Sequence, residues 1–331
     1  MKPEVPRRIR LIGAGGTIAM RGERAAPALD VDELVATVPE LAAFDGLEVE
    51  GVCNVPGAAL GLDGALAVAR AARRAGRDGR GVVVTSGTDT IEELAALIDL
   101  LYGGAPPIAV TGAIRPASAM GADGPANLRD AAGVAASSAA TGLGCVVVFG
   151  GQIHAARWVR KVDATGPVAF GSFQAGPIGW VEEGTPAILA RPDRREAIDP
   201  ARLDARVDVI AAGLGDDGAL VRAAVAGGAD GLVVVALGAG HLPPGVLEAV
   251  EAAARRVPVV ATVRPERGTV LHRTYGFRGS ERDLRASGVI VAGRRSAAAA
   301  RIALIAALGA GLGGAALRRV FVDDDSAPPV S

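Results

Sequence analysis

Hydroxyl and carboxylate side chains follow a buried strand near the middle of this sequence. Residues 81–94 begin with an apolar run, continue as Ser-Gly-Thr-Asp-Thr, and then take up helical spacing. This pattern predicts a strand, a tight turn and a helix N-terminus, with Thr88 and Asp89 at the carboxyl end of the strand. Open α/β sheets bind their ligands at that edge. Capping of the helix is the alternative role for Thr88 and Asp89.

A second threonine follows a short apolar run near the N-terminus. Residues 13–17 read Gly-Ala-Gly-Gly-Thr, and Thr17 ends this loop. A dinucleotide-binding fingerprint needs a glycine where Ile18 stands, so that interpretation is disfavoured. The loop predicts either an ordinary turn or a strand exit that brings Thr17 close to a ligand. In a parallel sheet, Thr17 and Thr88 would lie at the same edge.

Lysine is rare in this chain. Lysine and arginine together number 35, and Lys2 and Lys161 are the only lysines. Lysine can lose its proton when its pKa is lowered, whereas arginine stays protonated, so Lys161 is a candidate for proton transfer. Chance retention of one lysine is the alternative. A threonine hydroxyl needs a base to become a nucleophile, and Lys161 could serve Thr88 in this way. Asp89 could then balance the charge of Lys161 or bind a substrate ammonium.

Alternating strands and helices must position these side chains. The alternation predicts an α/β fold with a mostly parallel sheet and helices on both faces. Asp123 is the predicted N-cap of one helix, with Pro125 in its first turn. Up to residue 185, strands are predicted at 9–12, 47–54, 81–85, 107–111 and 144–150, and helices at 31–38, 62–75, 91–101 and from Asp123.

A polar, proline-containing stretch divides the chain into two predicted α/β domains. The larger N-terminal domain spans residues 1–185, the linker spans 186–206, and the smaller C-terminal domain spans 207–331. The second series has strands at 207–211, 231–237 and 258–263, and helices from Gly218, from Pro244 and at 296–308.

Composition excludes several classes of protein. The net charge is −1 and no basic stripe is present, so we expect no nucleic-acid partner. No uninterrupted apolar span of 18 residues is found, and residues 9–12 are too short for a signal-peptide core, so we expect a cytoplasmic protein without membrane segments. Cys53 and Cys145 lie in strand-like runs, and the three histidines are far apart. We therefore expect no disulfide and no histidine-based zinc site.

Several short stretches together resemble the bacterial-type L-asparaginase/glutaminase family. They are residues 15–19, 86–90, 112–116 with 121–128, and 160–162, which contains Lys161. Residues 238–241 and 275–277 extend the resemblance into the second domain. The resemblance implies an amidohydrolase that releases ammonia from L-asparagine, with glutamine as an alternative substrate.

The resemblance also implies roles for individual residues. Thr17 would be the nucleophile, and Thr88, Asp89 and Lys161 would move protons and activate water. Asp89 would also hold the α-ammonium of the substrate, and backbone N–H groups would stabilise the oxyanion. No metal or cofactor is implied, and the partner would be a second copy of the chain in a homodimer or homotetramer with shared active sites. The implied substrate contacts are Gly16, Gly57, Ala58, Ala59, Gly87, Thr88, Asp89 and Ala113.

Two departures from the family pattern leave the substrate open. The loop at residues 20–29 lacks the tyrosine that the family usually places there, and Ala58 and Ala59 stand where the family often has a serine. Tyr102 is predicted to be structural, whereas Tyr275 could reach a neighbouring subunit's site. The alternatives are an enzyme that acts on another amide and a non-catalytic binder of a small amide or amino acid.

Three further residues have two interpretations each. Arg115 and Asp123 could brace the loop beneath the site, but an ion pair and a helix cap are favoured for them. His241 could line a neighbouring site, but a solvated turn is favoured.

Overall fold

A computed structural model describes residues 8–22, 26–44 and 46–321 of the chain. The chain divides into two compact units, Met1–Ile198 and Asp199–Ser331, and each is described by itself. The larger first unit and the smaller second unit are both α/β, with mostly parallel sheets, as predicted.

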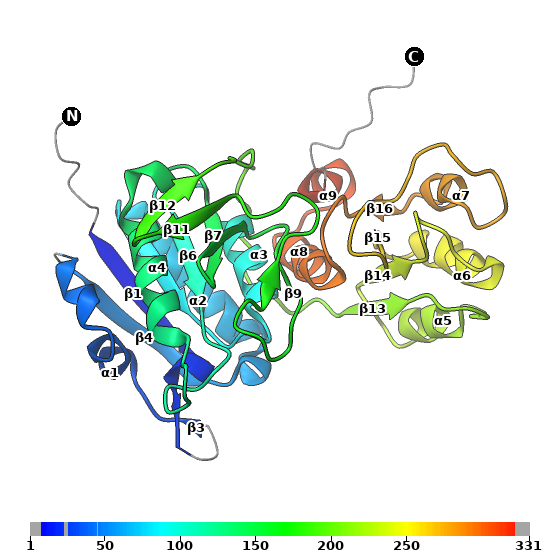
Figure 1. Cartoon of the computed structure of the whole chain (residues 1–331). Helices are drawn as coiled ribbons and strands as arrows, with labels where there is room; N and C mark the ends of the chain where they lie inside the picture. Colours follow the sequence, from blue (N-terminus) through cyan, green and yellow to red (C-terminus); the bar gives the residue numbers. More distant parts are fainter. Residues whose placement is uncertain (1–7, 23–25, 45, 322–331) are drawn as a thin grey trace. The chain divides into compact units, whose positions relative to one another are not determined.

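An eight-stranded sheet lies at the centre of the first unit (Figure 1), in the order β12-β11-β8-β7-β6-β5-β1-β4. Five neighbouring strands are parallel, so their carboxyl ends meet at one edge. They are β1 (Ile9–Gly15), β4 (Glu48–Val55), β5 (Gly81–Thr85), β6 (Ile108–Thr111) and β7 (Cys145–Phe149). The antiparallel strands are β8 (Gln152–Ala155), β11 (Gly179–Glu182) and β12 (Thr185–Ile188).

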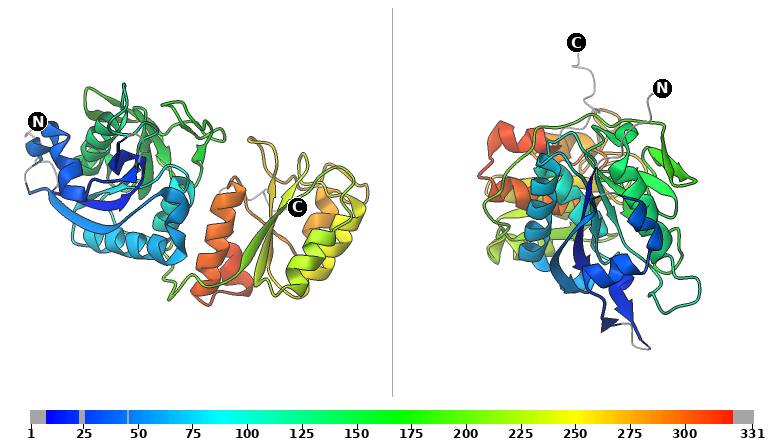
Figure 2. Two further views of the ribbon diagram at one scale, coloured as in Figure 1. Left: turned by 90° about the horizontal axis from the view of Figure 1, so that it is seen from below. Right: turned by 90° about the vertical axis from the view of Figure 1, so that its left-hand side faces the viewer.

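Helices cover both faces of this sheet, which Figure 2 shows edge-on in its right panel. Helices α2 (Gly61–Arg77) and α3 (Ile91–Leu101) pack on one face, and α1 (Val31–Ala36) and α4 (Gly124–Ala136) on the other. Every residue of β5, β6 and β7 is therefore buried. This double cover explains why these strands appear in the sequence as continuous apolar runs.

A separate two-stranded sheet carries Lys161. Strand β9 (Arg160–Lys161) pairs with β10 (Phe170–Gly171), and Lys161 lies opposite Phe170. The Phe170 ring packs against Phe149 of β7 with centroids 5.0 Å apart. Ser172, directly after β10, lies with its Oγ 3.0 Å from Nδ1 of His154 on β8. These two contacts attach the strand pair to the main sheet.

The second unit contains a parallel sheet of four strands in the order β13-β14-β15-β16. Its strands are β13 (Val207–Ala211), β14 (Gly231–Ala236), β15 (Val259–Val263) and β16 (Ile290–Val291). Helix α8 (Ala297–Gly309) covers one face, and α5 (Ala219–Ala226) and α6 (Pro244–Ala254) cover the other, as the left panel of Figure 2 shows. Helix α7 (Glu281–Ala286) packs on α6, and α9 (Gly314–Phe321) packs on α8.

The segment predicted as a linker, residues 186–206, begins as strand. Residues 186–188 belong to β12, and the first-unit part of the segment is held by arginines. Arg191 donates to the carbonyl of Thr141 at 2.8 Å, and Arg194 lies 3.1 Å from Asp99 of α3. None of the helices in the described ranges combines the length and apolar character needed to span a bilayer.

Acid sensitivity follows from His154, because burial lowers its pKa from 6.5 to about 4. Between these values the unfolded chain binds a proton at this residue and the folded chain does not. Lowering the pH from 6.5 to 4 should therefore reduce the free energy of unfolding by up to about 3 kcal/mol through this group. Urea unfolding at several pH values measures this loss. His154→Gln, which does not titrate, should lose less over the same range, and an equal loss in both proteins would contradict the assignment.

Candidate active site

Three loop backbones come into direct contact at the carboxyl edge of the main sheet. Gly16, Gly57 and Gly87 follow the adjacent strands β1, β4 and β5. A Cβ atom on Gly16 would lie 2.5 Å from Cα of Gly87, and one on Gly87 would lie 2.5 Å from Cα of Gly57. No side chain fits between these backbones. The loops that carry Thr17 and Thr88 are thereby brought to one place, as predicted from the sequence.

Thr17 begins a single 3-10 turn, η1 (Thr17–Ala19), directly after the glycines. Gly16 has φ 88° and ψ −179°, a conformation that residues with a Cβ rarely adopt. Its N–H donates to the carbonyl of Val55 on β4 at 3.0 Å. Ile18 and Ala19 are buried, whereas Thr17 is half-buried at the edge. The turn therefore fixes the backbone of Thr17 while its side chain stays accessible.

Thr88 and Asp89 do not cap α3. Thr90 is the N-cap residue, and its hydroxyl donates to the carbonyl of Gly57 at 3.2 Å. The capping interpretation is therefore wrong for Thr88 and Asp89. Thr88 is buried, while the Asp89 side chain is 64% exposed. The bond from Thr90 to Gly57 further ties the β5 loop to the β4 loop.

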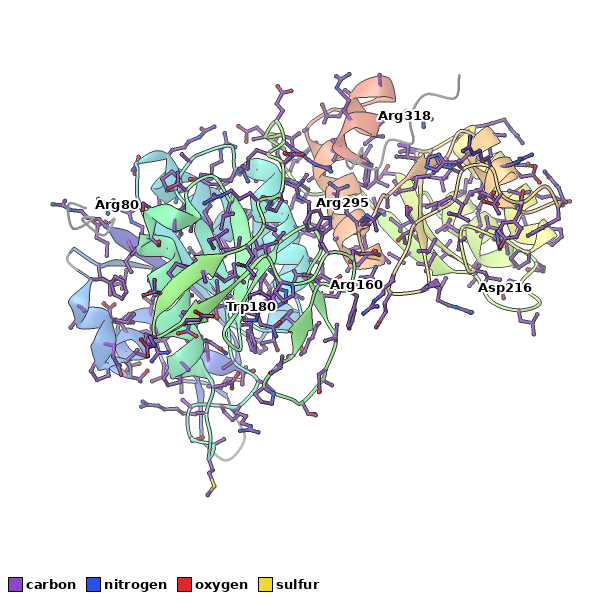
Figure 3. All side chains as sticks on the ribbon, turned by 45° about the horizontal axis from the view of Figure 1, so that its top comes forward. Arg80, Arg160, Trp180, Asp216, Arg295 and Arg318 are labelled. Atoms are coloured by element: carbon purple, nitrogen blue, oxygen red, sulfur yellow. The ribbon has the colours of Figure 1, made fainter. Side chains whose placement is uncertain are left out.

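Lys161 bridges these two side chains. Its Nζ donates to Thr88 Oγ1 at 3.0 Å and to Asp89 Oδ1 at 2.8 Å. The Lys161 side chain is 21% exposed, so it is more deeply buried than the Asp89 carboxylate to which it is bonded. Its strand starts at Arg160, which is labelled in Figure 3. A proton could pass directly between the amine and the hydroxyl at this distance.

The loop after β6 is braced by two side chains from α4 and its N-cap. Asp123 accepts from the N–H groups of Ile114 at 3.0 Å and Arg115 at 2.8 Å. Asn127 donates to the carbonyl of Gly112 and accepts from the N–H of Gly150, both at 3.0 Å. Asn127 was not singled out in the sequence analysis, although it lies in one of the family-like stretches.

The predicted N-cap position of Asp123, with Pro125 in the first turn of α4, is confirmed, whereas the predicted ion pair with Arg115 is wrong. Asp123 holds the N-cap position but makes no side-chain capping bond, and Arg115 donates instead to the carbonyl of Gly121 at 3.1 Å. The predicted contact residue Ala113 is buried in this braced loop.

The β4 loop offers backbone groups and methyl groups to the site. Ala58 and Ala59 are exposed on the 3-10 turn η3 (Gly57–Ala59), and Ala59 N–H donates to the carbonyl of Pro56 at 2.9 Å.

In the loop at residues 20–29, positions 23–25 lie outside the described residues. Tyr102 has the predicted structural role, since it is buried and its hydroxyl donates to the carbonyl of Pro106 at 2.7 Å.

His241 and Tyr275 form an aromatic cluster in the second unit. The His241 ring packs edge-on against Tyr275 at 4.8 Å and Phe277 at 5.1 Å between centroids. Its Nε2 lies 3.6 Å from a carboxylate oxygen of buried Glu281, and the side chain is 22% exposed. The predicted turn is present, since the His241 N–H donates to the carbonyl of Leu237 at 2.8 Å, but the ring is packed rather than solvated. The reach of Tyr275 into a neighbouring subunit's site stays a prediction.

Free thiols and titratable groups outside this site form no metal centre in the described part of the chain. Cys53 and Cys145 are free. No group of three or more His, Cys, Asp and Glu side chains there is arranged to hold a metal ion. The chemistry available at the edge of the sheet is thus that of two hydroxyls, one amine and one accessible carboxylate.

Known proteins match both units. The family described as "Asparaginase, N-terminal" matches residues 8–194, and the family described as "Glutaminase/Asparaginase C-terminal domain" matches residues 206–321. A "Probable L-asparaginase" of Deinococcus radiodurans is 37% identical, covering 95% of this chain and 97% of that protein. An "L-asparaginase" of Bacillus licheniformis is 33% identical, with 86% and 90% covered. The crystal structure of a probable cytoplasmic L-asparaginase from Campylobacter jejuni has a TM-score of 0.85 and 26% identity, covering 96% of this chain and 99% of that chain.

Substitution of Gly16 tests whether the site depends on backbone contact. Gly16→Ala should lower the free energy of unfolding by about 1–2 kcal/mol for its positive φ, and by about 1–3 kcal/mol more because the new methyl group meets Gly87. Gly22→Ala is the matched control, since Gly22 has φ 82° but no neighbouring atom within 4 Å of the added Cβ. Urea unfolding measures both changes. Equal losses in the two variants would contradict the contact argument.

Proposed function

The chain belongs to the bacterial-type L-asparaginase family, and we propose that it is an amidohydrolase that converts L-asparagine and water to L-aspartate and ammonia. The observation that carries this proposal is the position of the Lys161 amine, 3.0 Å from the Thr88 hydroxyl and 2.8 Å from the Asp89 carboxylate. The similarity to proteins named L-asparaginase over nearly the whole chain supports the choice of substrate.

In the first step of the proposed reaction, Thr17 attacks the side-chain amide. Its Oγ1 forms a bond to the amide carbon, and the hydroxyl proton passes through the Thr88–Lys161 pair to the leaving nitrogen. The carbon–nitrogen bond breaks, ammonia leaves, and the acyl group stays on Thr17 as an ester. Backbone N–H groups of the converging glycine loops would stabilise the oxyanion. The contact between Gly16 and Gly87 supports this step because it brings the two loops together.

In the second step, water hydrolyses the ester. Thr88 and Lys161 take a proton from the attacking water and return one to Thr17, and L-aspartate leaves. Lysine suits this role because it can both accept and release a proton, which arginine cannot do. Asp89 balances the charge on Lys161, and its exposed carboxylate can also hold the α-ammonium of the substrate.

Recognition of the substrate α-carboxylate falls to the β4 loop in this proposal. Ala58 and Ala59 have no hydroxyl, and the Ala59 N–H already donates to Pro56, so the backbone N–H groups of Gly57 and Ala58 are its candidate donors. A missing donor weakens binding by about 1–3 kcal/mol if the partner is left unpaired. Glutamine or a similar amide is the alternative substrate, which agrees with the description of the C-terminal family. Non-catalytic binding of a small amide is the third possibility, motivated by the same alanines.

Assembly and location belong to this proposal as well. Tyr275 and Phe277 are exposed aromatic residues on the second unit, and such a patch suits contact with a second copy of the chain. We propose a homodimer or homotetramer. We place it in the cytoplasm because the similar protein from Campylobacter jejuni is named a cytoplasmic L-asparaginase.

Removal of the nucleophile or the proton carrier should abolish turnover. Thr17→Ala and Lys161→Met should each lower kcat for ammonia release from L-asparagine by at least about 10³-fold. Lys161→Arg keeps the positive charge but cannot release a proton, so it should fail as well. Unchanged turnover in Thr17→Ala would refute the mechanism.

A panel of amides separates the three proposed activities. Wild-type protein should release ammonia from L-asparagine faster than from L-glutamine or an aliphatic amide, as measured by a coupled ammonia assay. A preference for another amide would identify that amide, rather than L-asparagine, as the substrate. A rise in Tm with L-asparagine but no ammonia from any amide would instead identify a binding protein.

A further inference from the structure

The backbone of Lys161 has no strand partner on one side. Strand β9 pairs with β10, and no other pairing of β9 occurs in the part of the chain that the structure describes. The N–H of Val162 donates across this pair to the carbonyl of Ala169 at 2.7 Å. Because successive N–H groups of a strand point to opposite sides, the N–H of Lys161 points away from β10. It therefore needs an acceptor from another element.

Glu92 provides that acceptor. Its Oε2 lies 3.3 Å from the backbone nitrogen of Lys161. Glu92 stands in the first turn of α3, only three residues after Asp89. One short segment, residues 88–92, therefore contacts Lys161 at three points: Thr88 and Asp89 bind its amine, and Glu92 binds its backbone. The amine and the backbone of Lys161 are therefore both held by the start of α3.

We propose that Glu92 is a positioning residue for the amide hydrolysis, holding the backbone of Lys161 so that its amine stays within reach of Thr88. This proposal rests on the proposed function. Glu92 does not need to touch the substrate, because its effect passes through Lys161. A lysine side chain has a flexible four-carbon stem, so a shift of its backbone changes which positions its amine can reach.

A general effect on the helix is the competing explanation. An acidic residue in the first turn of a helix stabilises it through the helix dipole. Glu93 occupies the same turn and carries the same charge, so it would share that effect. Glu93→Ala is therefore the matched control for Glu92→Ala. Glu92→Gln is the conservative variant, since it keeps a side-chain oxygen that can accept from the Lys161 N–H.

The kinetic test compares these three variants in ammonia release from L-asparagine. Misplacement of a catalytic group by about 1 Å costs up to roughly 10²-fold in rate, so Glu92→Ala should lower kcat by about 10- to 100-fold. KM should change less than threefold, because the backbone bond exists with or without substrate. Glu92→Gln should recover most of kcat, and Glu93→Ala should keep it. Equal loss in Glu92→Ala and Glu93→Ala would overturn the proposal.

A second test reads the contact without any activity. The sequence has two lysines, Lys2 and Lys161, so protein labelled with [¹⁵N]lysine gives two backbone amide signals, which Lys2→Arg assigns. In Glu92→Ala the Lys161 amide signal should shift, and its proton should exchange with solvent at least about tenfold faster. Glu93→Ala should leave that signal unchanged. An unshifted signal in Glu92→Ala, or a shifted signal with wild-type kcat, would overturn the proposal.

These outcomes are distinct from failure of the proposed function. If wild-type protein releases no ammonia from any amide, the amidohydrolase proposal fails, while the lysine signals still show whether Glu92 holds Lys161. If wild-type protein is active and Thr17→Ala is not, the function stands and the Glu92 variants decide the positioning role alone.

Discussion

The contact between the Lys161 amine and the Thr88 hydroxyl is the interaction on which the proposed chemistry depends. A hydroxyl carries protons poorly at neutral pH unless a base is hydrogen-bonded to it. Lysine can act as that base because it can release its proton, whereas arginine stays protonated. Asp89 makes the arrangement possible by offsetting the lysine charge at 2.8 Å. The same carboxylate is exposed enough to face an incoming ammonium group.

Backbone geometry, more than side-chain chemistry, brings Thr17 close to Thr88 and Lys161. Gly16, Gly57 and Gly87 follow neighbouring parallel strands, and their backbones come into contact because none has a Cβ. A mostly buried sheet with helices on both faces holds these strand ends. Asp123 and Asn127 brace the loop after β6 with three hydrogen bonds to backbone, and Asn127 also accepts from the N–H of Gly150 after β7. The short strands β9 and β10, together with the His154–Ser172 contact, hold Lys161 in place.

Much of this arrangement could be predicted from the sequence. Continuous apolar runs such as residues 81–85 indicate buried parallel strands, and the scarcity of lysine draws attention to Lys161. The hydrogen-bond and packing partners of other individual side chains could not be predicted. Asp123 has the sequence position of a cap but binds the backbone of Ile114 and Arg115, and His241 packs in an aromatic cluster. Strand β9 is two residues long, too short for any periodicity to show.

The central claim is that Thr17 carries the acyl group that the Thr88–Lys161 pair then helps to release. Mass spectrometry of peptides from protein quenched with acid during turnover of L-asparagine tests it most directly. An aspartyl ester on the peptide that contains Thr17 is the predicted result. An adduct on a different residue, with the Thr17 peptide unmodified, would contradict the account.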